Sequence, residues 1–328
     1  MRASEARAAI RAAAIVIIAA LTLSAWPSVS AGQGDVPHIG VLVFRPRTVS
    51  RLPEVFSRAL RELGYVDGRN VRLDFRYAEA REDRVAELAA ELVRLKVAVI
   101  VAEDTPAAHA LKKATTTLPI VMVSGDPVGT GLVASLARPG GNITGVAGTG
   151  AEIAGKGLQL FRQLLPRATR MGLLASRTDP FATPLRAQSR QAAVRLKIEL
   201  QEVVVDGPDE LEAALATLMK GKVEGLIVHP ILATPELAEL ALRARLPTTA
   251  ASAPFVRAGG LMSYSADRDH LYEKLATYVD KILKGARPGD LPVERPTKFE
   301  FAINLKTAKA LGLTVPQALL LQADQVIQ

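Results

Sequence analysis

The feature that most constrains the fold is the regular alternation of short β-branched runs with amphipathic helical segments. Residues 39–44 form an apolar run rich in Val and Ile, and residues 52–64 carry apolar side chains at helical spacing up to a terminating glycine. The alternation continues through expected strands at 71–77, 97–102 and 119–123 and expected helices at 84–95 and 105–114. Apolar strands connected through helices predict a parallel sheet with helices on both faces.

The pattern restarts after a Gly-rich stretch at residues 139–142. Further strands are expected at 143–147, 171–175, 200–205, 225–229, 260–263 and 298–304, and further helices at 151–165, 184–196, 209–220, 235–244, 269–283 and up to Gly312. A chain of 328 residues has room for about two domains. We therefore predict an α/β protein with two Rossmann-like lobes, whose carboxyl strand ends surround a shared crevice where ligands bind.

Composition excludes several classes of protein and of site. The charge is balanced and 49% of the residues are hydrophobic, which excludes a disordered chain. The absence of cysteine excludes a disulfide scaffold and a thiolate metal site. The four histidines (His38, His109, His229 and His270) are too far apart in sequence for a metal-binding motif. We expect no metal and no cofactor.

The net charge of +8 makes nucleic acid the first partner to consider. Lys and Arg are nevertheless spread along the chain, and the expected helices mix both signs, as at residues 81–84. Aromatic residues, which would stack on bases, make up only 4% of the chain. We interpret the charge as solvated surface and expect no nucleic-acid partner.

Residues 1–31 have the organisation of an export signal. Three arginines precede an apolar run at 12–23, and Val29 and Ala31 supply small residues at the −3 and −1 positions of a cleavage site. The run is shorter than the roughly 20 residues that span a membrane, although an uncleaved short anchor is the alternative. We expect cleavage near Ala31 and a periplasmic protein. Export disfavours ATP- or nicotinamide-dependent enzymes and cytosolic regulators.

Catalytic motifs are absent. Residues 150–156 spell most of a phosphate-binding loop, but Gly157 follows where Mg²⁺ ligation needs Ser or Thr, so we interpret the match as the start of a helix. Asn142-Ile143-Thr144 is a glycosylation sequon in spelling only. No Gly-x-Ser-x-Gly elbow or cysteine nucleophile is present. We therefore expect a binding protein and not an enzyme.

Several candidate ligand-binding residues lie between the expected strand 97–102 and the next helix. Thr105 is a good N-cap and Pro106 suits the first helical position, which leaves free N–H groups that favour a carboxylate, unless the arrangement only caps the helix. Glu103 and Asp104 would instead meet an ammonium group.

Three residues follow expected strands and add further candidates. Arg45, directly after the first strand, is the best candidate partner for a ligand carboxylate. Phe44 and Phe181 would stack on an apolar or aromatic part of the ligand.

A long block resembles one family closely. It runs from Leu118 through the Asp126-Pro127 pair to Gly140-Gly141-Asn142-Ile143-Thr144-Gly145-Val146, and further matching segments lie at 62–71, 258–264 and 296–313. The chain resembles the ABC-transporter substrate-binding proteins of the type 1 periplasmic binding fold, in the branch that includes tryptophan/tyrosine-type components. The likeness covers essentially the whole chain after the export signal.

The resemblance implies two lobes joined by a hinge that exchange segments. The first lobe would hold residues 32–146 and 260–297, and the second lobe 147–259 and 298–328. Hinge closure would capture a small, carboxylate-bearing, amino-acid-like ligand, which a monomeric protein delivers to an ABC permease in the inner membrane. The alternative is a periplasmic sensor that presents the ligand to a membrane receptor.

The candidate ligand-binding residues follow from the two lobes. Thr105, the neighbouring amides and Ser124 would hold the polar head from the first lobe, with Asp126 of the Asp-Pro pair beside them. The residues expected to complete the cage from the second lobe are Ser176, Asp179, His229 and Ser252. Around these second-lobe residues the sequence departs from the family's Asn-Pro-Asn-Asn, Asp-Pro and Tyr-Glu-Phe-Arg-Glu-Phe patterns, which leaves the identity of the ligand open.

Overall fold

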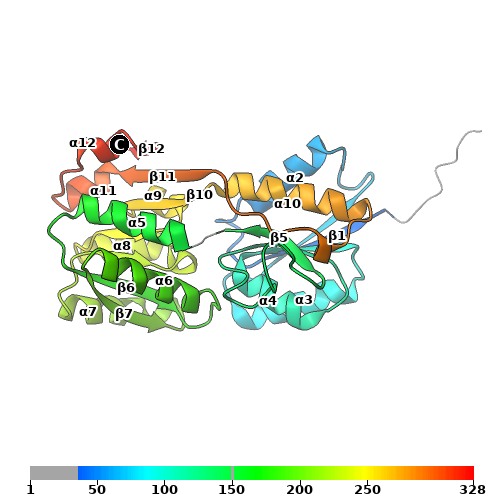
Figure 1. Cartoon of the computed structure of the whole chain (residues 1–328), viewed down its shortest axis with the longest axis horizontal. Coiled ribbons are helices and arrows are strands. Elements are labelled where there is room, and N and C mark those ends of the chain that lie inside the picture. The colour runs from blue at the N-terminus through cyan, green and yellow to red at the C-terminus, as the bar shows by residue number, and fades with distance from the viewer. Residues whose placement is uncertain (1–35, 149–150) are drawn as a thin grey trace, which may run out of the picture. The chain divides into compact units, whose positions relative to one another are not determined.

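The computed structural model describes residues 36–148 and 151–328, so the export signal expected at 1–31 lies outside the described residues. The amino-terminal half of the described chain forms a five-stranded parallel sheet (Figure 1). Its strands, in spatial order, are β2 (Arg72–Tyr77), β1 (His38–Val43), β3 (Val99–Glu103), β4 (Ile120–Ser124) and β5 (Ile143–Ala147).

Helices cover both faces of this sheet because its strands are apolar on both sides. Ile39, Val41 and Val43 of β1 pack on one face, and Leu42 packs on the other. The first face is covered by α2 (Leu52–Glu62) and by α10 (Arg268–Leu283), which comes from far along the chain. The other face is covered by α3 (Glu82–Arg94) and α4 (Asp104–Ala114).

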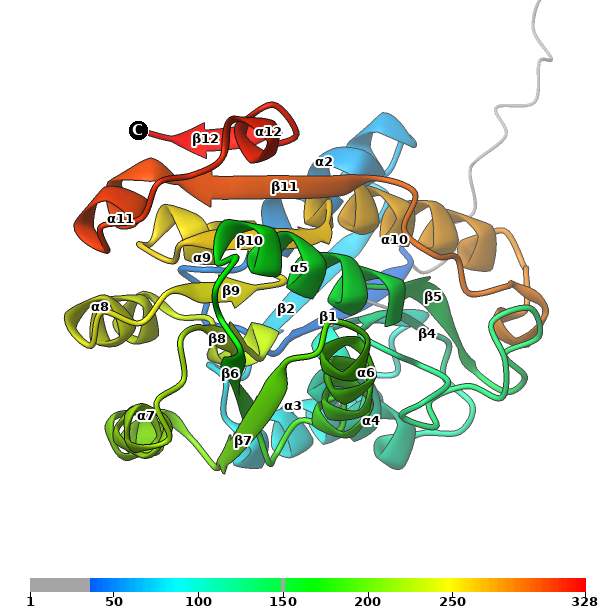
Figure 2. The ribbon, with the colours of Figure 1, turned by 60° about the vertical axis from the view of Figure 1, so that its left-hand side comes forward.

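The second sheet has seven strands and is parallel except where β10 and β11 run antiparallel. Its order is β12 (Gln325–Ile327), β11 (Phe299–Asn304), β10 (Met262–Ala266), β9 (Thr248–Ala250), β8 (Leu226–Val228), β6 (Arg170–Ser176) and β7 (Glu199–Val205). Figure 2 shows α5 (Ala151–Leu164) and α6 (Ala182–Arg195) on one face and α7 (Leu211–Lys220) and α8 (Pro235–Arg243) on the other. The prediction of two α/β lobes is confirmed.

Four short elements were absent from the sequence prediction: β9, α9 (Ala253–Arg257), α12 (Gln317–Leu320) and β12. Each is three to five residues long, which is too short to show a period of 2 or 3.6. The remaining short helix, α11 (Leu305–Ala310), lies where a helix ending at Gly312 was expected.

The expected exchange of segments needs one correction. Residues 260–297 were expected in the first lobe, but β10 pairs with β9 and β11 of the second sheet, and only α10 and the segment after it pack on the first. Val146 of β5 bridges Glu294 in that returning segment. The chain thus crosses between the lobes after β5, after β10 and before β11. Among the described residues, no helix combines the length and the apolar character needed to cross a membrane.

Candidate ligand-binding crevice

The carboxyl ends of strands from both sheets enclose an inner crevice of about 30 Å³. Asp104, Thr105 and Ser124 line it from the first lobe, at the ends of β3 and β4. Asp179, Phe181 and Ala251 line it from the second lobe, from the loops after β6 and β9. Parallel sheets bind ligands at this edge, so the crevice lies where the topology predicts a site.

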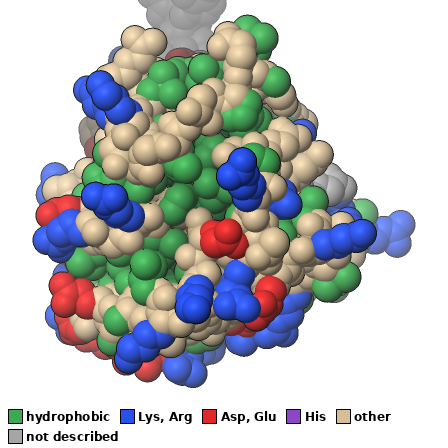
Figure 3. All heavy atoms as spheres, turned by 90° about the vertical axis from the view of Figure 1, so that its left-hand side faces the viewer, with side chains coloured by type: hydrophobic (Ala, Val, Ile, Leu, Met, Phe, Trp, Pro, Cys, Tyr) green, Lys and Arg blue, Asp and Glu red, His purple; other side chains and the backbone are tan. Residues whose placement is uncertain are grey.

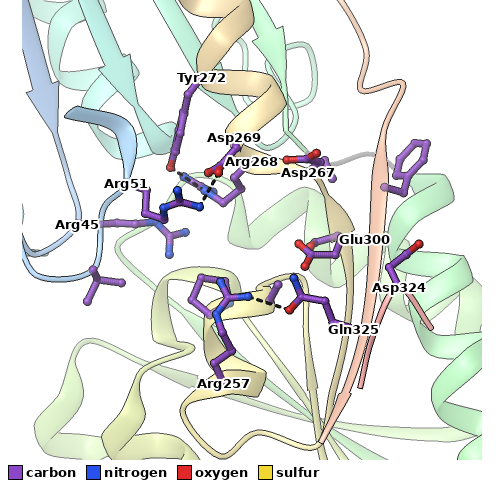
Figure 4. Close-up of a pocket in the computed structure, with 16 residues that line it drawn as sticks. Arg45, Arg51, Arg257, Asp267, Arg268, Asp269, Tyr272, Glu300, Asp324 and Gln325 are labelled. Atoms are coloured by element: carbon purple, nitrogen blue, oxygen red, sulfur yellow. Dashed lines mark hydrogen bonds and ion pairs between the residues drawn. The ribbon is translucent and has the colours of Figure 1, made fainter. Parts of the chain in front are cut away.

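A larger outer cavity of about 440 Å³ has Arg268 in its lining (Figure 4). It shares Ser265, Ala266 and Arg268 with the inner crevice, so the two spaces adjoin at the crossing between β10 and α10. Its charged lining comes from both lobes: Arg45, Arg51, Arg257, Arg268, Asp267, Asp269, Glu300 and Asp324. Four basic and four acidic side chains balance each other around this space.

The wall between the two spaces is a network of ion pairs. The Nε atom of Arg45 donates to Asp104 over 2.6 Å, and Arg268 donates to Asp104 over 3.2 Å and to Glu103 over 3.1 Å. Glu103 also accepts hydrogen bonds from the hydroxyls of Ser50 and Tyr272. Burial would raise the pKa of Asp104, but Arg268 and Arg45 hold that pKa at about 2. The acids that were expected to meet an ammonium group are therefore already paired.

Thr105 does not cap the helix, contrary to the expectation. Helix α4 begins at Asp104, which has a φ of +68°, and no side chain caps it. The Thr105 hydroxyl instead lies 3.1 Å from the Ser124 hydroxyl and accepts a hydrogen bond from the N–H of Gly125. The buried ends of β3 and β4 are joined by these bonds, and both residues line the crevice.

The wall from the second lobe contains a buried acid, Asp179, and a buried histidine, His229, behind it. Asp179 is 3% exposed, and its Oδ1 accepts a hydrogen bond from the N–H of Phe181. His229 is fully buried behind it, with Nε2 lying 3.6 Å from Asp179 Oδ2, which is too long for a hydrogen bond. Among the residues that the structure describes, neither ring nitrogen of His229 has a hydrogen-bond partner. Burial raises the pKa of Asp179 to about 7 and lowers the pKa of His229 to about 3.

The two lobes touch across the crevice. A Cβ atom added to Gly125, after β4, would lie only 2.5 Å from Cδ2 of Phe181 in the second lobe. The Phe181 ring in turn lies 5.7 Å from the His229 ring, centroid to centroid. Burial raises the pKa of Glu82 in α3, and Thr178 of the second lobe opposes that rise. The structure therefore shows the crevice closed at this point.

An apolar cavity of about 40 Å³ adjoins the inner crevice beneath α5 and α6. It is lined by Leu158, Leu185 and Tyr264, and it shares Pro230 and Ala251 with the crevice. An apolar extension beside a charged crevice is the combination that ligand pockets usually offer.

Six predicted residues do not line either space. Glu103 and His229 lie behind the crevice wall, where Glu103 contacts Arg268 and His229 contacts Asp179. Phe44 is buried in the core between the sheet and α3, and the Asp126 carboxylate closes a turn by accepting from Gly129. Ser176 bonds to the hydroxyl of Thr178, and Ser252 only precedes α9. Strand ends place residues near a crevice, but the side-chain direction of each was not readable from the sequence.

Arg268 is the central residue that the sequence analysis missed. Its strand was expected to end at residue 263, whereas β10 extends to Ala266 and delivers Arg268 directly to the crevice. If the end of this strand had been predicted at residue 266, Arg268 would have been a candidate, because residues that follow strands were chosen as candidates elsewhere.

In the described part of the chain, no group of three His, Asp or Glu side chains is arranged to hold a metal ion. On the face shown in Figure 3, Lys and Arg side chains stand at separate positions and do not form one continuous patch.

Comparison with known proteins places this geometry in a family. Residues 48–327 match the family described as ABC transporter substrate binding protein. A tyrosine-binding protein of Clostridioides difficile (strain R20291) is 30% identical over 285 residues, which cover 84% of this chain and 81% of that protein.

Solved structures agree with that assignment. An ABC domain from Streptococcus pneumoniae in complex with L-Trp is 30% identical, with a TM-score of 0.81 over 89% of this chain and 99% of that one. A conserved domain protein from Vibrio cholerae is 25% identical, with a TM-score of 0.82 and the same coverage. More distant relatives share the fold of type 1 periplasmic binding proteins.

Proposed function

This chain belongs to the family of ABC transporter substrate-binding proteins, and we propose that it captures an amino acid between its lobes for an ABC importer. The family consists of solute-binding proteins and not of enzymes. The observation that carries the proposal is the crevice at the strand ends of both lobes, with Gly125 and Phe181 in contact across it. Delivery to an inner-membrane permease and residence in the periplasm after cleavage near Ala31 are parts of the same proposal.

The relatives support an amino acid as the solute. One relative is named for tyrosine, and another was solved with L-Trp. The outer cavity, at about 440 Å³, is within the range of small-molecule sites. Its lining contains both acidic and basic side chains, which suit a zwitterion, and the apolar cavity beside Pro230 and Ala251 offers space for part of a side chain.

Capture would proceed by closure of the lobes. Three crossings connect them, after β5, after β10 and before β11, and these segments are the proposed hinge between a first lobe that includes α10 and a second lobe that includes β10. A solute that contacts both walls stabilises the closed form and shifts the population towards it. The permease would then recognise that form.

The test is a thermal-shift screen of residues 32–328, which contain the compact unit 37–328, after unfolding and refolding to remove any carried-over solute. The panel holds the amino acids, aromatic acids, dicarboxylates, purines and sugars. We expect a saturable rise in melting temperature with L-tyrosine or L-tryptophan that follows mass action. A response to sugars or purines alone, or to nothing in the panel, would contradict the proposal.

Two variants make the screen specific to the crevice. Ala251→Phe adds a ring where the inner crevice meets the apolar cavity, so it should abolish the shift. Val194→Phe makes a comparable change on α6, where the side chain is 77% exposed, and should leave the shift intact.

A further inference from the structure

The charges around the inner crevice leave one acid unbalanced. Asp104 and Glu103 are held by Arg45 and Arg268, so two acids face two bases. Asp179 faces the same space from the second lobe. Among the described residues, its one partner within ion-pair distance is His229, at 3.6 Å.

His229 does not supply the missing positive charge. It is fully buried, and burial lowers its pKa to about 3, so the imidazole is neutral at physiological pH. Within residues 36–148 and 151–328 its two ring nitrogens have no hydrogen-bond partner, although buried polar groups normally have one. The second wall therefore presents the Asp179 carboxyl group to the crevice, with the His229 imidazole buried behind it. A cation in the crevice would balance this carboxyl group.

We propose that Asp179 receives the ammonium group of the bound amino acid and that His229 is the positioning residue behind it. This assignment rests on the proposed function and names the residue that makes it selective for amino acids. A cation on Asp179 would lie between that acid and Asp104 on the opposite wall, where both carboxyl groups attract it. A bound cation would therefore stabilise the closed form, in which the two acids face the same crevice.

The assignment makes binding release a proton. Burial raises the pKa of Asp179 to about 7, with Asp104 and Glu82 raising it further and the Phe181 N–H and Arg45 opposing them. In the closed crevice without a solute, this carboxyl group thus holds about half a proton near pH 7. An adjacent ammonium group favours the ionised form, so the proton leaves to solvent as the amino acid binds. Affinity should weaken by up to about tenfold for each pH unit below pH 7.

The experiment is calorimetric titration of the full mature chain with L-tyrosine and with 3-(4-hydroxyphenyl)propionate, which lacks the ammonium group. Titrations in buffers of different ionisation enthalpy count the protons released. The wild-type protein should bind L-tyrosine much more tightly than the deaminated analogue. It should release protons when L-tyrosine binds and none when the analogue binds. Asp179→Asn should lower the affinity for L-tyrosine by about 10- to 100-fold and change the affinity for the analogue little. Proton release on binding of L-tyrosine should disappear in this variant.

Two further variants separate positioning from folding. His229→Gln should keep the preference for L-tyrosine but move the pH midpoint of binding, which a purely structural role would not do. Asp83→Asn removes an exposed acid on α3, 65% exposed, and should change neither quantity.

The outcomes separate the two proposals. Equal binding of L-tyrosine by wild type and Asp179→Asn, with equal proton release, would overturn the assignment and leave the proposed function standing. Failure of the wild-type protein to bind any amino acid would overturn the proposed function and the assignment with it.

Discussion

The Nε atom of Arg45 donates a 2.6 Å hydrogen bond to Oδ2 of Asp104, so the arginine after the first strand is bound to the acid after the third. The parallel register pairs Val43 with Glu103, which places the two strand ends side by side. Arg45 and Asp104 follow those two strand ends and are therefore close enough to form an ion pair. Arg45, which the sequence suggested as a partner for a ligand carboxylate, is therefore bonded to a carboxylate of its own chain.

Arg268 should contribute more to stability than any exposed arginine, because it bonds to both Glu103 and Asp104. Arg268→Met leaves buried carboxylates short of a partner and should lower the free energy of unfolding by about 3–5 kcal/mol. Arg58→Met, which removes a half-exposed pair with Glu273, should cost less than about 1 kcal/mol. Urea denaturation measures both, and equal losses would refute the role given to Arg268.

The sequence predicted the alternation of elements well because buried strands and amphipathic helices are periodic. The apolar run at 39–44 became β1 and the helical spacing from Leu52 became α2. Periodicity cannot show which sheet a strand joins. Residues 262–266 were therefore assigned to the wrong lobe, since backbone pairing with β9 and β11 decides their place.

The sequence offered candidate site residues but not the bonds between them. Thr105, Ser124, Asp179 and Phe181 line the inner crevice, and their contacts with a solute stay a prediction. The pairing of Asp104 with two arginines and the burial of Phe44 depend on contacts between distant segments. A single sequence carries no periodic signal for such contacts.

The dependence of stability on pH should be nearly flat between about pH 4 and 6.5, because two buried groups oppose each other. Asp179 has a raised pKa of about 7, so the folded state holds the proton longer and the free energy of unfolding falls as pH rises from about 4 to 7. His229 has a lowered pKa of about 3, so the unfolded state binds the proton first and the free energy of unfolding rises with pH up to about 6.5.

Single variants should expose each slope. Asp179→Asn leaves His229, and stability should then rise between about pH 4 and 6.5. His229→Gln leaves Asp179, and stability should then fall over the same range. Chemical denaturation of the solute-free protein across this range measures both slopes. Parallel profiles for the two variants would show that the groups do not titrate as described.

Gly125 should control closure of the lobes. A side chain there meets the Phe181 ring, with an added Cβ only 2.5 Å from it, and overpacking of this kind costs about 1–3 kcal/mol. This cost arises only when the lobes are closed. Gly125→Val should therefore weaken solute binding by about 5- to 100-fold and leave the free energy of unfolding of the open form unchanged. Calorimetry and small-angle scattering measure affinity and compactness.

Removal of the ring provides the matched control for that variant. Combining Gly125→Val with Phe181→Ala should restore closure on solute addition, because the added side chain then meets no ring. If the double variant still failed to close, the contact between these residues would not be the cause.

Two glycines should respond to alanine with opposite signs. Gly145 in β5 has a φ of +136°, and an added Cβ would lie 2.1 Å from the carbonyl oxygen of Met122 in β4. Because a backbone atom blocks the space and the conformation is strained for other residues, Gly145→Ala should lower the free energy of unfolding by about 4 kcal/mol. Gly155 lies within α5 with nothing within 4 Å of an added Cβ. Gly155→Ala should therefore raise the free energy of unfolding by about 0.5–1 kcal/mol through helix propensity. Urea denaturation measures both variants, and a loss of stability in Gly155→Ala as well would contradict the placement of α5.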